Sequence, residues 1–125
     1  MAAAPTPADA SEGGVMSAVT LTVSTLLDGA AEFGDRDDAA MALALSDAPE
    51  AERALLAVAS DKEADVDLSD RCGESLARIW CRRGTVDAKT IERLNTVARR
   101  IALATIEALS PSLSEVLRRH GLKSG

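Results

Sequence analysis

Apolar residues recur at spacings of three and four along most of this chain, and that spacing is typical of amphipathic α-helices. Polar residues, glycines and prolines interrupt the pattern between the apolar segments. The sequence therefore predicts five long or medium helices and a short terminal one, at about 16–33, 35–45, 49–60, 67–83, 87–109 and 111–121.

The first of these segments also fits a strand. Val19, Leu21 and Val23 alternate with polar residues, which is the pattern of a half-buried strand. Val19, Val23 and Leu26 equally share one face of a helix. We favour the helix, because the sequence offers no second strand with which a lone strand could satisfy its backbone.

Short polar residues and special backbone residues mark the helix ends. Asp35, Asp67 and Asp87 are predicted N-caps, because a carboxylate there can accept hydrogen bonds from the free N–H groups of the first turn. Prolines are tolerated in a first turn, and glycines close helices. The residues predicted to fill these roles are Pro49, Gly84, Pro111 and Gly121.

The segment 67–83 carries a strip of small residues. Gly73, Ala77 and Cys81 are spaced four apart, so they share one face on which another helix can approach closely. Trp80 lies on the neighbouring apolar stripe, where we predict a core residue; the alternative is an interface anchor, since Trp is frequent in binding hot spots.

Cysteine usage favours a reducing compartment. Cys72 and Cys81 lie nine residues apart in one predicted helix, a rise of roughly 13 Å. A disulfide requires a Cα separation of about 4.4–6.8 Å, so the two residues cannot pair with each other in that helix. Unpaired thiols are typical of cytoplasmic proteins.

One domain is predicted. Residues 1–14 read as a disordered tail rich in Ala, Pro, Ser and Gly, residues 15–121 as a single α-helical domain, and residues 122–125 as a short tail. The start of the chain lacks the basic and apolar regions of a secretory signal, and no apolar run reaches the about 18 residues of a transmembrane helix.

The stretch from Ala51 to Gly84 reads AERALLAVASDKEADVDLSDRCGESLARIWCRRG. An Ala/Leu helix, a turn of Asp residues and a second helix with small residues follow one another, and this order resembles a HEAT-type helical hairpin. The resemblance implies two antiparallel helices that stack on their neighbours. Because a solenoid needs three or more repeats, we expect a compact all-α bundle with HEAT-like packing.

The sequence offers little chemistry for catalysis, metals or cofactors. Its one histidine, His120, follows Arg118 and Arg119 at a predicted helix end, where cations complement the helix dipole. No paired-Cys or paired-His ligand spacing, EF-hand loop or glycine-rich phosphate loop is present. We therefore predict a protein that is not an enzyme and binds no cofactor.

Charge is divided unequally along the chain. Residues 1–70 carry a net charge of −12 and residues 71–125 carry +6, for a total of −6 and a pI of about 4.7. This acidity argues against nucleic-acid binding. Helix capping accounts for part of the division but not for the acidic loop after residue 60. The predicted partner-binding residues are Asp35, Asp37, Asp38, Glu63, Asp65 and Asp67.

Length, acidity and alanine content also resemble, in general character, the small immunity proteins that bacteria pair with polymorphic toxins. That resemblance implies a cytoplasmic protein that binds and neutralises a basic toxin domain, with electrostatic steering by its acidic half. The alternative is a structural module or assembly subunit, such as a homodimer through the strip of Gly73, Ala77 and Cys81 with Trp80 beside it.

Overall fold

The structure, a computed structural model, describes residues 18–122, and within them it contains seven helices and no strand. The predicted all-α class is therefore confirmed. The first helix occupies residues 18–27 of the described range. The others are α2 (Phe33–Leu43), α3 (Pro49–Ala59), α4 (Val66–Arg83), α5 (Ala88–Glu92), α6 (Thr96–Leu109) and α7 (Pro111–Arg119).

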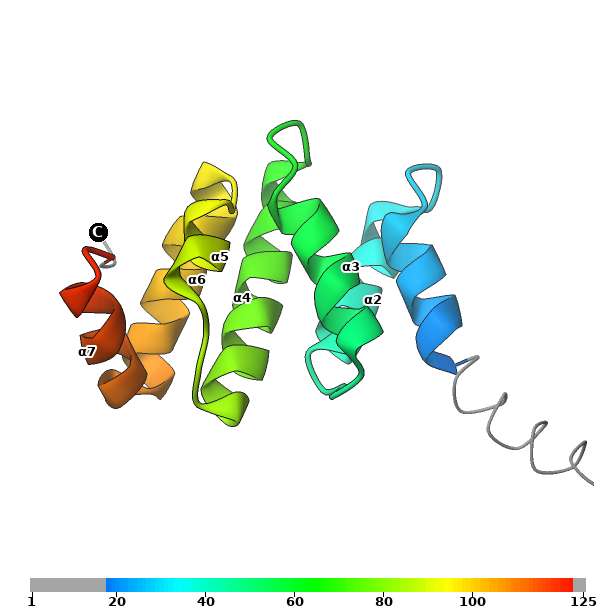
Figure 1. Ribbon diagram of the computed structural model, residues 1–125. Coiled ribbons are helices and arrows are strands. Elements are labelled where there is room, and N and C mark those ends of the chain that lie inside the picture. The colour runs from blue at the N-terminus through cyan, green and yellow to red at the C-terminus, as the bar shows by residue number, and fades with distance from the viewer. Residues whose placement is uncertain (1–17, 123–125) are drawn as a thin grey trace, which may run out of the picture.

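The helices stand side by side, roughly in chain order, from the first helix at one end to α7 at the other (Figure 1). In that view α2, α4 and α6 run in the same direction, and α3 runs opposite to α4. Because α4 packs on α2, α3 and α6, it holds both halves of the molecule together.

Leucine and alanine make up most of the core. Trp80 is fully buried in it, so the prediction of a core tryptophan is confirmed. The core extends to Leu122, which is 5% exposed. Leu122 follows the predicted domain at 15–121, and the predicted tail at 1–14 lies outside the described residues.

The small-residue strip of α4 packs within the chain. A Cβ atom at Gly73 would lie 2.5 Å from the carbonyl oxygen of Ala98, so only glycine permits this approach of α4 to α6. Ala77, one turn further on, is also fully buried, and Cys81 is half-buried. A second copy of the chain could not reach Gly73 or Ala77 without displacing α6.

The predicted boundary between the first two helices was wrong. The first helix ends at residue 27 instead of 33, because the Asp28 carboxylate accepts a hydrogen bond from the N–H of Ala30 and fixes a turn. Helix α2 then begins at Phe33 after Glu32, which makes no side-chain cap. Asp35, the predicted N-cap, therefore lies in the first turn of α2.

The predicted N-cap of α4 was wrong by two residues. Asp65 fills this position, and its Oδ1 accepts a hydrogen bond from the N–H of Leu68 at 3.0 Å. Asp67 lies in the first turn and is exposed. Both residues have the chemistry of a cap, so the sequence pattern alone did not distinguish them. The other end was predicted correctly: Gly84 closes α4 with a φ of +84°.

The long helix predicted at 87–109 is two helices. Asp87 does cap its start, but α5 ends at Glu92 and α6 begins after Asn95. The Asn95 side chain accepts from the N–H of Ala98, and its amide donates to the Asp61 carbonyl and the Ser69 hydroxyl. These contacts to α4 and to the loop before it stabilise the break.

The close approach at Gly73 predicts an unusual penalty for a single methyl group. Gly73→Ala should lower the free energy of unfolding by about 1–3 kcal/mol, because the obstructing atom belongs to the α6 backbone. Gly34→Ala is the control: nothing lies within 4 Å of its Cβ, so stability should stay unchanged or rise by up to about 1 kcal/mol. Urea denaturation measures both, and equal effects would contradict the packing.

The buried bonds of Asn95 predict a larger cost than that of an ordinary cap. Asn95→Ala should lower the free energy of unfolding by about 2 kcal/mol or more, because a cap and two further hydrogen bonds disappear together. Asp87→Ala, which removes an exposed cap alone, should cost about 1 kcal/mol or less. Thermal or urea unfolding compares the two; a smaller effect at Asn95 would show that these contacts do not stabilise the break.

Candidate protein-binding surface

The acidic segments meet at one edge of the molecule. The loop at 28–32 and the loop at 60–65 both lie at the edge where α2, α4 and α6 begin (Figure 1). A helix N-terminus carries partial positive charge, which stabilises nearby carboxylates. The dipoles of α2 and α4 therefore favour acidic residues at this edge, and those that remain exposed are available to a partner.

The six predicted partner-binding residues do not form one patch. Asp35 and Asp38 border a groove between the first helix and α2, whereas Glu63 and Asp65 border a second groove between the two loops. Asp37 points elsewhere and Asp67 borders neither groove. The Arg36 side chain lies in the second groove, where its Nε donates to the carbonyl of Leu26.

The first groove is shallow and open to solvent, with a volume of about 410 Å³. Asp35 and Asp38 are both exposed and make no ion pair with any described residue. Its other lining residues are uncharged: Leu21, Thr22, Thr25, Ala39 and Ala42. The sequence pattern does not single these residues out, although Leu21 lies off the apolar stripe of its helix, a position that indicates exposure.

The second groove has a volume of about 340 Å³ and a mixed charge. Asp61 and Glu63 are exposed in the loop, and the Asp61 carboxylate accepts a hydrogen bond from the Glu63 N–H at 2.9 Å. Asp65 is partly used by its cap to Leu68. With Arg36 also in the lining, this groove offers fewer free acceptors to a cationic partner than its sequence suggests.

Asp37 stabilises the fold and is not free to bind a partner. Its Oδ1 accepts from Nε of Arg71 at 2.9 Å, and the same guanidinium pairs with Glu74, which also binds Arg78. This hydrogen bond with Asp37 raises the pKa of Arg71. The Asp37–Arg71 pair joins α2 to α4, so neutralising Asp37 would disturb packing as well as any docking.

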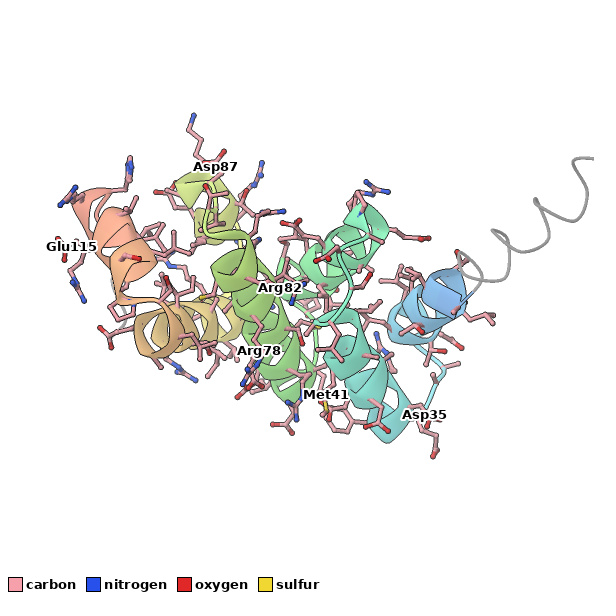
Figure 2. All side chains as sticks on the ribbon, turned by 90° about the horizontal axis from the view of Figure 1, so that it is seen from below. Asp35, Met41, Arg78, Arg82, Asp87 and Glu115 are labelled. Atoms are coloured by element: carbon pink, nitrogen blue, oxygen red, sulfur yellow. The ribbon has the colours of Figure 1, made fainter. Side chains whose placement is uncertain are left out.

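Acidic side chains are not confined to one end of the row of helices. In Figure 2, seen from below, Asp35 lies at the outer end of α2, and Met41 lies between it and Arg78 of α4. Arg82 lies further from Asp35, toward the middle of the molecule. Asp87 and Glu115 lie beyond these arginines, so acidic side chains occur toward both ends of the row.

A larger cavity of about 470 Å³ lies between the start of α3 and the end of α4. Its two arginines are engaged by carboxylates: Arg82 bonds Asp47, and Arg83 forms two hydrogen bonds with Glu52. Oε2 of Glu52 also accepts from the indole N–H of Trp80 at 2.8 Å. This network closes the core below the cavity, and its charges are satisfied internally.

The thiols lack the properties of nucleophiles. Burial raises the pKa of Cys72 to about 12, and burial also raises the pKa of Cys81. Since the thiolate is the reactive form, neither sulfur is activated. Among residues 18–122, no group of three His, Cys, Asp or Glu side chains could hold a metal ion. No helix in this range is both long and apolar enough to cross a bilayer.

Comparison with known proteins gives no assignment: no family model, curated protein or solved structure matches the chain significantly. Function therefore has to be inferred from the surface itself. The two acidic grooves and the exposed carboxylates around them are the features of that surface available for recognition.

Glu52 predicts a pH-dependent contribution to stability. The hydrogen bond from Arg83 lowers the pKa of Glu52 and Trp80 adds to this, although burial opposes it. A carboxyl with a lowered folded-state pKa stabilises the fold above its unfolded value, and this contribution disappears as pH falls through the folded value. Glu52→Gln should therefore destabilise the protein at pH 7, by an amount that shrinks below about pH 4.5.

Urea denaturation at pH 7, 5 and 3.5 measures this change. Glu50→Gln, in the same first turn but without an arginine partner among the described residues, is the matched control. The role of the Arg83 pair would be contradicted if Glu52→Gln lowered the free energy of unfolding equally at every pH. It would also be contradicted if Glu50→Gln lowered it by the same amount.

Proposed function

We propose that this protein is a non-catalytic, cytoplasmic protein-binding module, and specifically an immunity protein that binds and neutralises a basic toxin domain. The observation that carries the proposal is the acidic edge, where Asp35, Asp38, Glu63 and Asp67 are exposed and unpaired among the described residues. Such a field accelerates encounter with a basic surface.

The architecture supports a binding role with HEAT-like packing. Helices α3 and α4 are antiparallel neighbours joined by the loop at 60–65, and α2 and α6 pack on α4. Stacked hairpins of this kind present broad surfaces and loop edges to partners. The free cysteines, Cys72 and Cys81, support a reducing compartment.

The alternative of an assembly subunit has lost its main support. Three of the four residues predicted at a homodimer interface are buried within the chain: Trp80, Gly73 and Ala77. The exposed acidic residues also give two copies like charges at this edge. We therefore favour a basic partner of different sequence.

Neutralising the acidic edge should weaken binding to such a partner. We expect the product of the gene next to this protein's own to bind it, and the variant Asp35→Asn, Asp38→Asn, Glu63→Gln, Asp67→Asn to associate at least about tenfold more slowly. Dependence of the association rate on salt should also decrease, because steering is electrostatic. Surface plasmon resonance at two or more salt concentrations measures both.

A variant with the same change in net charge at the other half is the control. Glu92→Lys, Ala104→Lys and Ala108→Lys alter exposed positions of α5 and α6. This variant should bind nearly as well as the natural protein. Absence of any association, or equal losses in the two variants, would contradict the proposed function.

A further inference from the structure

The first helix has an exposed, uncharged face. Residues 18–27 contain no acidic or basic side chain, and this helix lies at one end of the row (Figure 1). Val23 and Leu26 pack toward the core, but Leu21 remains 66% exposed beside the groove with α2. Leu21 therefore gives this groove one exposed apolar side chain that is free to contact a partner.

The threonines of this helix contribute methyl groups to the groove, because their hydroxyl protons are used within the helix. The hydroxyl of Thr22 donates to the carbonyl of Ala18 at 2.8 Å, and that of Thr25 donates to the carbonyl of Leu21 at 3.1 Å. Because both hydroxyls donate their protons within the helix, their methyl groups remain for contact. Ala39 and Ala42 line the α2 side, and their small side chains let another backbone approach closely.

Carboxylates stand at one rim of this apolar groove. Asp35 and Asp38 are three residues apart in α2, so they lie on one side of the helix about one turn apart. Asp37 points away from them and is bound by Arg71. The groove thus combines an apolar wall with two acceptors at a spacing that matches successive turns of a facing helix.

We propose, building on the function proposed above, that this groove docks one amphipathic basic helix of the protein partner. An apolar side chain of that helix packs on Leu21 and the threonine methyl groups, while lysine or arginine side chains flanking it bind Asp35 and Asp38. This is the helix-in-groove mode of recognition, in which apolar anchors hold the helix and charges fix its orientation.

Charge argues for a basic partner over the other possible occupants. The residues before the described range include Asp9 and Glu12 and no lysine or arginine, so that segment does not complement the acidic rim. An isologous contact between two copies would bring the acidic rim of each toward the acidic rim of the other. A basic amphipathic helix complements both the rim and the wall.

The groove can be tested with a defined probe, a synthetic amphipathic peptide of leucine and lysine with all leucines on one helical face. We expect NMR titration of the full chain to shift the signals of Leu21, Thr22, Thr25, Asp35 and Asp38 most strongly. Asp35→Asn with Asp38→Asn should weaken peptide binding about tenfold. Leu21→Ser should weaken it by a similar factor, without unfolding, because this side chain is largely exposed.

Glu63→Gln with Asp67→Asn removes equal charge outside this groove and should change peptide affinity by less than about twofold. If this control loses as much affinity as the groove variants, or if the peptide does not bind, the groove proposal is wrong. The proposed function would then still be decided separately, by binding of the neighbouring gene's product. Dimerisation in sedimentation that Leu21→Ser abolishes would instead assign the groove to a second copy.

Discussion

The close contact of α4 with α6 at Gly73 determines where the other helices lie. With no Cβ in the way, the α6 backbone at Ala98 sits directly on α4, and Asn95 ties the start of α6 to the loop before α4. The opposite side of α4 is then free to bind α2, through the hydrogen bond from Ser75 to the Ala40 carbonyl and the ion pair of Arg71. One helix thus sets the spacing of its neighbours on both sides.

The acidic surface follows from this packing. Because Asp37 is held by Arg71 and Arg36 by the end of the first helix, the orientation of α2 about its axis is fixed. Asp35 and Asp38 must then face the first helix, where no described cation neutralises them. The dipole of α2 lowers the cost of placing charges there, so a surface suited to a basic partner is compatible with a stable helix.

Sequence patterns predicted what depends on local chemistry. Pro49 and Gly84 act within one turn of helix, and both ends were predicted correctly. The break at Asn95 was missed, because it depends on atoms of Asp61 and Ser69, distant in sequence. The sequence did not show how the acidic residues divide between two grooves, since that depends on how α2 is rotated against its neighbours.

Long-range charge and the apolar groove would act at different stages of binding. Carboxylates spread along the edge, such as Glu63 and Asp67, contribute to a field that reaches about a Debye length and raises the rate of encounter. In the proposed complex, Leu21 and the threonine methyl groups would act only at contact, where burying apolar surface slows dissociation. Because the two sets of residues occupy separate places, substitutions in one set would change the association rate and substitutions in the other would change the dissociation rate. Many acidic surfaces attract basic proteins, so the apolar contact in the groove would supply the selectivity for one basic helix.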